Sequence, residues 1–143
     1  MRPGFRDYLQ EMNKHYEVVI FTACLPLYGD LILDVLDPTK MISQRLYREH
    51  CSMKDRVFVK DLSMLGRRME DIILLDNSPN SYIWQPQNAI PISSWYGDYQ
   101  DIEFAKLTGL FVKLSQVGDV REILSISHKE HQLNLKLACD MAD

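Results

Sequence analysis

The stretch Ile72-Ile73-Leu74-Leu75-Asp76-Asn77-Ser78-Pro79 decides the expected fold of this chain. It begins with a short apolar run, the pattern of a strand that is buried on both faces of a parallel sheet. It continues with polar and turn-forming residues, so the strand is expected to end abruptly after Leu75. The stretch therefore predicts a parallel sheet that is covered by helices on both faces.

Outward from this stretch, helical and strand patterns alternate along the chain. Apolar residues recur at helical spacing over residues 4–16, and residues 17–23 form a short β-branched run. Pro26 is suited to begin a second helix, and Asp37-Pro38 is suited to end it. Further strands are expected at 45–50, 56–60 and 88–92, and further helices at 100–114 and 117–137. The alternation predicts an open α/β sheet.

The composition is that of one globular domain. The chain has 143 residues, 46% of them hydrophobic and 25% charged. These values exclude disordered, collagen-like and coiled-coil classes. Sixteen Lys and Arg against twenty Asp and Glu give a net charge of −4, which argues against direct binding of nucleic acid. No apolar run approaches the ~20 residues of a membrane-spanning helix, so no membrane segment is expected.

Polar residues follow three of the expected strands, at the edge where open α/β sheets bind ligands. They are Thr22, Lys60 and the pair Asp76 and Asn77. Lys and Thr can contact phosphate oxygens, while Asp and Asn offer oxygen ligands to Mg²⁺. Each residue also has an ordinary structural interpretation: Thr22 as a turn residue, Lys60 with Asp61 as a solvated charge pair, and Asp76-Asn77-Ser78-Pro79 as a turn.

Other chemistries do not fit the sequence. A thiol phosphatase needs Arg six positions after its Cys, but Asp30 and Val57 stand at those positions after Cys24 and Cys51. His128 and His131 share a helix face without an evident third zinc ligand. The three cysteines, Cys139 included, are widely spaced and predict reduced thiols in the nucleus or cytoplasm.

Four longer motifs carry a family resemblance, and two shorter ones, Asn88-Ala89-Ile90-Pro91-Ile92 and Ser94-Trp95-Tyr96, continue it. The chain resembles the small C-terminal-domain phosphatases, which have an FCP-type (NLI-interacting-factor-like) homology domain and belong to the haloacid-dehalogenase superfamily. The resemblance runs from Arg2 to about Ile123. The longer motifs are Phe21-Thr22-Ala23, Arg45-Leu46-Tyr47-Arg48-Glu49-His50-Cys51, Val59-Lys60-Asp61-Leu62-Ser63-x-Leu65-Gly66-Arg67 and Leu75-Asp76-Asn77-Ser78-Pro79.

The resemblance implies a Mg²⁺-dependent protein serine/threonine phosphatase that acts on phosphoproteins such as the C-terminal repeat of RNA polymerase II. The implied fold is a haloacid-dehalogenase-like three-layer α/β/α open parallel sheet, here lacking its first strand. The implied domain covers residues 1–125, with a C-terminal helical extension at 126–143.

The resemblance also assigns roles to individual residues. Thr22 would hydrogen-bond the phosphoryl group, Lys60 would neutralise its charge, and Asp76 would hold Lys60 and the water shell of the metal. Asn77 would be a direct Mg²⁺ ligand. Substrate binding would fall to Arg48, for the phosphate, and to Leu25 and Tyr28, for the peptide.

One departure from the family pattern is large. The family's nucleophile lies in an Asp-x-Asp-x-Thr motif ahead of the Arg2-Pro3-Gly4 equivalent, and no Asp-x-Asp occurs in this sequence. The chain is therefore expected to be N-terminally truncated and inactive alone, whether as a fragment, a short isoform or a non-catalytic relative. The alternative function is a binding module of the same homology group, such as a receptor subunit of the mitochondrial presequence translocase. The sequence gives no oligomeric state.

Overall fold

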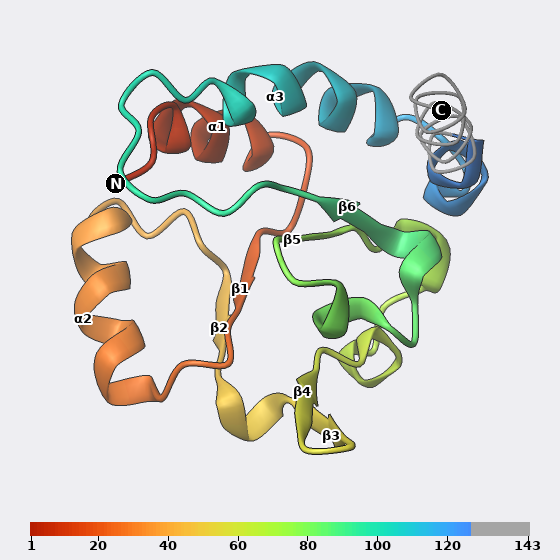
Figure 1. Cartoon of the computed structure of the whole chain (residues 1–143). Helices are drawn as coiled ribbons and strands as arrows, with labels where there is room; N and C mark the ends of the chain where they lie inside the picture. Colours follow the sequence, from red (N-terminus) through yellow and green to blue (C-terminus); the bar gives the residue numbers. More distant parts are fainter. Residues whose placement is uncertain (127–143) are drawn as a thin grey trace, which may run out of the picture.

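The computed structural model describes residues 1–126 and has an α/β architecture (Figure 1). Short strands alternate with helices and with five single-turn 3-10 helices, η1 to η5. The helices and strands are α1 (Phe5–Met12), β1 (Val19–Phe21), α2 (Pro26–Leu36), β2 (Gln44–Leu46), β3 (Ser52–Lys54), β4 (Val57–Val59), β5 (Leu74–Asp76), β6 (Ala89–Pro91) and α3 (Glu103–Leu114).

The strands of this part of the chain pair two by two. β1 pairs with β2 and β5 pairs with β6, both in parallel, while β3 and β4 form an antiparallel hairpin. Val19 lies opposite Gln44 in the first pair, and Leu74 lies opposite Ala89 in the second. The predicted parallel pairing is thus confirmed, but the residues described form separate two-stranded sheets rather than one continuous sheet.

The second helix begins and ends where the sequence predicts. Pro26 occupies the first turn of α2, where its missing N–H costs no hydrogen bond. Asp37 follows the helix and its carboxylate accepts the backbone N–H groups of Met41 at 2.9 Å and Ile42 at 2.8 Å. These contacts direct the chain from the end of α2 into β2.

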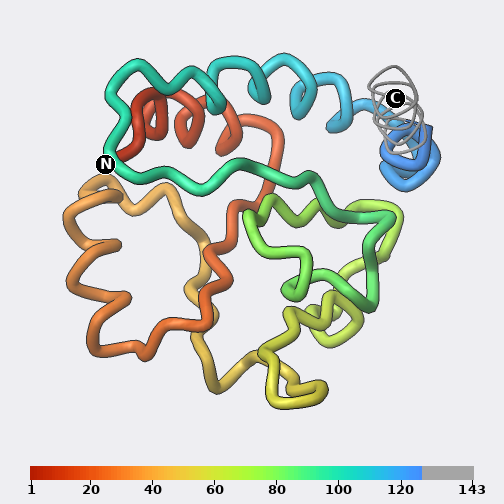
Figure 2. The backbone as a smooth tube through the Cα atoms, viewed as in Figure 1, coloured from red at the N-terminus to blue at the C-terminus, as the bar shows by residue number. Residues whose placement is uncertain are grey.

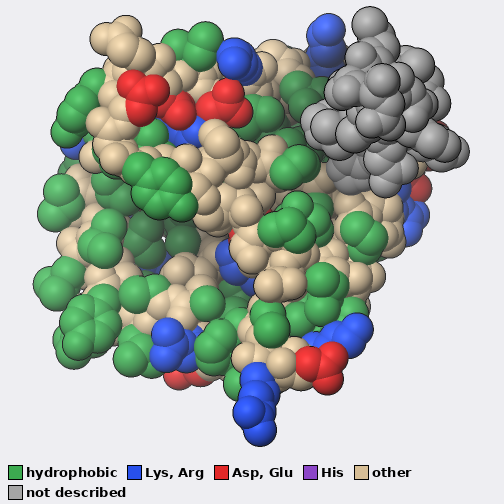
Figure 3. Space-filling view, viewed as in Figure 1, with side chains coloured by type: hydrophobic (Ala, Val, Ile, Leu, Met, Phe, Trp, Pro, Cys, Tyr) green, Lys and Arg blue, Asp and Glu red, His purple; other side chains and the backbone are tan. Residues whose placement is uncertain are grey.

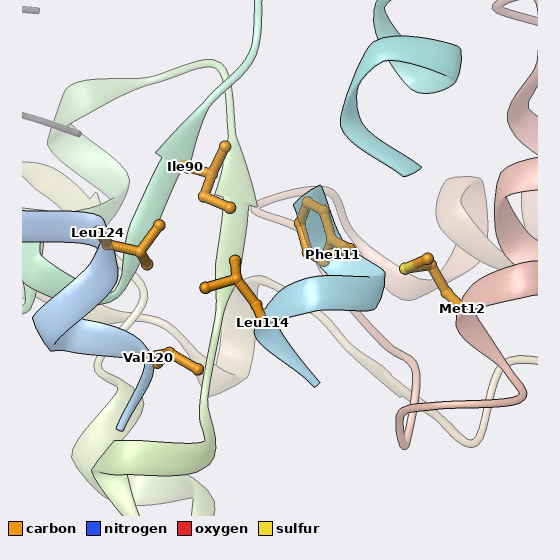
Figure 4. Packing of buried hydrophobic residues seen from close by; sticks show 6 residues of the cluster. All are labelled: Met12, Ile90, Phe111, Leu114, Val120 and Leu124. Atoms are coloured by element: carbon orange, nitrogen blue, oxygen red, sulfur yellow. The ribbon is translucent and has the colours of Figure 1, made fainter. Parts of the chain in front are cut away.

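The main hydrophobic core lies where α1 and α3 pack on the β5–β6 pair. Figure 2 shows that α1 and α3 run side by side although they are far apart in the sequence. The buried residues of this cluster come from α1, β6, α3 and the helix at 120–126 (Figure 4), and they are Met12, Ile90, Phe111, Leu114, Val120 and Leu124. A second cluster, Leu9, Leu33, Ile42 and Tyr47, packs α1 against α2 and β2.

One sequence expectation about these elements needs correction, and another lies partly outside the described residues. The strand expected at 45–50 is only partly right, because β2 ends at Leu46 and Arg48–His50 forms the 3-10 helix η1. The His50 ring accepts the backbone N–H of Tyr47 at 2.8 Å, so a local cap replaces strand pairing there. The last helix is described for residues 120–126 only; the rest of the expected 117–137 segment, with His128 and His131, lies outside the described residues, as does Cys139.

No helix among residues 1–126 has the length and apolar character needed to cross a membrane.

Candidate active site

A largely buried ion pair between Lys60 and Asp76 forms the centre of the candidate site. Lys60 follows β4, Asp76 ends β5, and the Lys60 Nζ donates to Asp76 Oδ2. The two side chains are 12% and 5% exposed. The other carboxylate oxygen of Asp76 accepts the N–H of Ser78 at 2.8 Å. The local Asp76-Asn77-Ser78-Pro79 turn therefore fixes the carboxylate that holds the ammonium in place.

Asn77 stands beside this pair and is exposed to solvent. Its Nδ2 donates to Ser94 Oγ at 2.9 Å, which turns the amide so that its oxygen has no protein partner among residues 1–126. The sequence interpretation did not single out Ser94 as a site residue. A signal was present, because Ser94 lies shortly beyond the end of β6, three residues after Pro91, and Asn77 directly follows β5.

Thr22 follows β1 and its hydroxyl oxygen accepts the N–H of Cys24 at 3.1 Å. This is the local turn that its structural interpretation predicts, and it leaves the hydroxyl proton available as a donor. The preceding residue reaches the ion pair, because Lys60 Nζ lies 5.9 Å from the centre of the Phe21 ring. The carboxyl ends of β1 and β5 therefore meet at Lys60.

The three predicted substrate-binding residues lie on the α2 and η1 side of this edge. Arg48 donates from Nε to the carbonyl of Ala23 at 2.7 Å, and its guanidinium lies 5.2 Å above the Phe58 ring. Leu25 and Tyr28 are exposed at the start of α2. Exposed apolar side chains of this segment form the hydrophobic surface over α2 at the left of Figure 3.

A cavity of about 980 Å³ opens beside the ion pair, between β1 and β5. Lys60, Asp76 and Asn77 line it, together with Ser93 and Ser94 of the segment after β6. Thr22 is not among the lining residues, although its neighbour Phe21 is. The arrangement places an ammonium, a carboxylate and an amide oxygen at the edge of a hollow that can admit another molecule.

The charges of this site affect the pKa of the Cys51 thiol. Burial raises the pKa of its thiol, and Asp76 adds to this effect, whereas Lys60 and Arg48 oppose it. The net rise favours the protonated thiol, which is a poor nucleophile. The raised pKa thus agrees with the sequence argument against thiol chemistry at Cys51.

The donor set of the site suits part of a magnesium coordination shell. Residues 1–126 contain no group of three or more His, Cys, Asp or Glu side chains able to hold a metal. Asn77 offers a free amide oxygen, whereas both carboxylate oxygens of Asp76 already accept hydrogen bonds, which leaves Asp76 to contact the water shell of an ion. Mg²⁺ commonly takes one or two protein oxygens and keeps several waters. These residues fit a partly hydrated ion whose remaining ligands come from outside this part of the chain.

Comparison with known proteins assigns the family. The model of the NLI interacting factor-like phosphatase family matches residues 1–121. The chain belongs to this phosphatase family. Its FCP-type relatives include Phosphatase PSR1 of Saccharomyces cerevisiae, 47% identical over 88% of this chain and 30% of that protein. Another is the human carboxy-terminal domain RNA polymerase II polypeptide A small phosphatase 1, 42% identical over 86% of this chain and 47% of that protein.

A solved structure shows the fold of the family. The chain matches the fission yeast RNA polymerase II CTD phosphatase Fcp1, bound to beryllium fluoride, with a TM-score of 0.56 at 15% identity. The match covers 99% of this chain and 49% of that structure. The haloacid-dehalogenase-like α/β fold is therefore confirmed. The chain spans less than half the length of these relatives, and the roles of its individual site residues stay predictions.

Proposed function

We propose that this chain supplies the phosphate-binding and metal-binding part of a Mg²⁺-dependent protein serine/threonine phosphatase. The observation that carries the proposal is the buried Lys60–Asp76 ion pair with the exposed Asn77 amide oxygen beside it, at the edge of a cavity. Membership of a phosphatase family supports the same chemistry.

In this proposal, each residue stabilises charge or fixes position around a phosphoryl group. Phosphoryl transfer depends mainly on placing charges around the transferring group and on aligning the attacking oxygen. Lys60 would neutralise the phosphoryl oxygens, and Asp76 would keep the Lys60 ammonium in position. Thr22 would donate a hydrogen bond from its hydroxyl group to the phosphoryl group. A bound Mg²⁺, held by Asn77 with Asp76 in its water shell, would supply further positive charge.

The substrate side of the proposal concerns the surface around α2. Arg48 would bind substrate phosphate, and the exposed Leu25 and Tyr28 would contact the flanking peptide. We propose phosphoserine or phosphothreonine peptides of the RNA polymerase II C-terminal type as substrates, and a nuclear or cytoplasmic location. The name of the human relative supports the substrate class.

The nucleophile is the part that this sequence does not contain. The family mechanism needs an aspartate that attacks phosphorus, releases the seryl oxygen and is then freed by water, but no Asp-x-Asp occurs in the 143 residues. We propose that activity requires this chain together with a segment that carries Asp-x-Asp-x-Thr.

The experiment compares this chain with a longer version that carries such a segment ahead of residue 1. With p-nitrophenyl phosphate and Mg²⁺, the chain alone should show no turnover, and the longer version should hydrolyse the compound and also phosphoserine peptides. Chelation of Mg²⁺ should abolish both activities. A longer version that is folded but inactive, or that binds phosphopeptides without hydrolysing them, would favour a non-catalytic binding module instead.

A further inference from the structure

The segment that follows β6 is held against the end of β5. The N–H of Ile92 donates to the carbonyl of Asp76 at 3.1 Å, which continues the pairing of the two strands past Pro91. Two residues further on, Ser94 Oγ accepts a hydrogen bond from Asn77 Nδ2 at 2.9 Å. The hydroxyl of Ser94 therefore determines which end of the Asn77 amide faces it, and the amide oxygen is left on the other side.

The orientation of this amide matters because its two ends have opposite character. A side-chain amide has an NH₂ donor at one end and an oxygen acceptor at the other, and rotation that exchanges the two ends meets only a broad, two-fold preference. Only the oxygen can face a cation. Asn77 and Ser94 are both exposed, so water can replace their hydrogen bond at little cost to the stability of the fold. Its main effect is on the orientation of the amide.

The position of Ser94 is fixed in turn by Arg2. Arg2 Nη1 donates to the carbonyl of Ser93 at 2.6 Å, and Nη2 donates to the Ser93 hydroxyl at 2.9 Å. The same guanidinium binds both carboxylate oxygens of Asp101, and the side chains of this ion pair are only 11% and 12% exposed. Figure 1 shows the N-terminus beside the chain that leads from β6 to α3. One planar group thus holds both ends of the segment 93–101, which carries Ser94.

We propose that Ser94 is a positioning residue for metal binding and that Arg2 acts through it. Ser94 keeps the amide oxygen of Asn77 free for a divalent cation, and Arg2 keeps Ser94 within reach of Asn77. The inference rests on the proposed function, in which Asn77 is a Mg²⁺ ligand. Loss of a hydrogen-bonding partner behind a metal ligand commonly weakens metal affinity about 10–100-fold. Because Ser94 is exposed, we expect the lower end of this range.

The first test uses this chain without metal. NMR should show one side-chain amide proton of Asn77 with a chemical shift and an exchange rate that differ from those of the exposed Asn80, because it is bonded to Ser94. Ser94→Ala should bring both values close to those of Asn80, while Ser94→Thr, which keeps a hydroxyl, should not. The urea midpoint should stay nearly the same in both variants. Asn77 signals that Ser94→Ala leaves unchanged would overturn the proposal.

The second test measures metal binding in the longer version that carries an Asp-x-Asp-x-Thr segment. Mn²⁺ is the probe, since it suits the same oxygen ligands as Mg²⁺. By calorimetry, Ser94→Ala should raise the Kd for Mn²⁺ about tenfold, and Ser94→Thr should keep the native value. In assays, a high Mg²⁺ concentration should restore the kcat of Ser94→Ala. Ser115→Ala is the matched control, because it removes one hydroxyl hydrogen bond, to Val112, at the end of α3.

The role of Arg2 is tested by Arg2→Lys, because Lys keeps the charge but cannot bind Ser93 and Asp101 as a planar fork. This change should raise the Kd for Mn²⁺ several-fold, and it should add little to Ser94→Ala, since both act through one contact. Additive losses would overturn the step from Arg2 to Ser94. Equal Kd values for Ser94→Ala and the native longer version would overturn this proposal alone, whereas a native longer version that binds no Mn²⁺ would overturn the proposed function.

Discussion

At the residue scale, the buried Lys60–Asp76 pair has more than one consequence for the molecule. The pair holds the end of β5 against the residue that follows β4, and Lys60 also donates its backbone N–H to Ser81 at 2.9 Å. Removing one partner of a buried pair leaves a charge in a poorly solvated place. The site thus combines a proposed chemical role with a structural one, and experiments must separate the two.

Replacing Lys60 with Ala should destabilise the chain by about 3–5 kcal/mol, because it leaves the Asp76 carboxylate buried and unpaired. The double variant Lys60→Met with Asp76→Leu should recover most of this loss, since it removes both charges. Urea unfolding measures the free energies. Lys54→Ala is the matched control, because Lys54 is exposed in β3 and should change stability little. Equal stability of Lys60→Ala and the native chain would show that the pair does not stabilise the fold.

A second ion pair, between Arg2 and Asp101, makes the stability of the protein depend on pH. Arg2 contacts both carboxylate oxygens of Asp101, at 2.9 and 2.7 Å, and also binds the carbonyl of Ser93 at 2.6 Å. The hydrogen bonds from Arg2 lower the pKa of Asp101 below its usual value. Arg2 therefore joins the start of the chain to the segment between β6 and α3.

The lowered pKa of Asp101 determines the direction in which the stability of the protein changes with pH. A carboxyl group whose pKa is lowered by folding stabilises the folded state at pH values above its unfolded pKa of about 3.9. This stabilisation is lost as the pH falls through the pKa of the folded state. Asp101→Asn should therefore lower the urea midpoint at pH 7, with a difference from the native chain that shrinks toward pH 3. Glu49→Gln, at an exposed carboxylate with no ion-pair partner in residues 1–126, should show no comparable trend. A deficit for Asp101→Asn that is constant across pH would contradict the assignment.

At the element scale, α2 is positioned by one close approach to η1 and β2. Gly29 faces the Tyr47 ring so closely that an added Cβ would lie 2.6 Å from a ring carbon. Tyr47 is buried, and its hydroxyl donates to Asp30 of the same helix, which also accepts from Arg45 at 2.8 Å. This contact sets the distance between α2 and the chain that leads to Arg48.

Gly29→Ala should destabilise the chain by about 1–3 kcal/mol, because the added methyl group forces the helix and the Tyr47 ring apart. Gly109→Ala is the matched control in α3, where an added Cβ meets nothing within 4 Å. That change should stabilise the helix by up to about 1 kcal/mol, since Ala is the better helix former. Thermal or urea unfolding of the two variants decides the question, and stabilisation by both would show that the Tyr47 contact is not tight.

At the scale of the whole molecule, the sequence predicts elements better than it predicts their pairing. The apolar runs around Ile20, Leu74 and Ile90 mark β1, β5 and β6 because each run ends at polar or turn residues. The β3–β4 hairpin was harder to foresee. Its turn residues Asp55 and Arg56 have φ of 49° and 66°, and a sequence without the usual Asn-Gly or Asp-Gly gives no signal for such a turn.

The candidate site shows the same limit of sequence reasoning. Lys60, Asp76 and Thr22 were foreseeable because each stands at the carboxyl end of an apolar run, where open α/β sheets bind ligands. The distances between them and the hydrogen bond from Asn77 to Ser94 depend on how β5 and β6 pair, which no local pattern specifies. The division of the strands into separate pairs likewise depends on the whole fold, because the same apolar runs would also fit one continuous sheet.

The most direct test of the central claim is the effect of Asn77→Ala on kcat/KM in the version of the protein that carries an Asp-x-Asp-x-Thr segment. Asn77 is exposed, so this variant should fold like the native protein. Asn80→Ala, at an exposed position a few residues further along, is the matched control. We predict that Asn77→Ala lowers kcat/KM for a phosphoserine peptide about 10²–10³-fold and raises the Mg²⁺ concentration needed, while Asn80→Ala changes neither. Equal rates and equal Mg²⁺ dependence for the two variants would contradict the account.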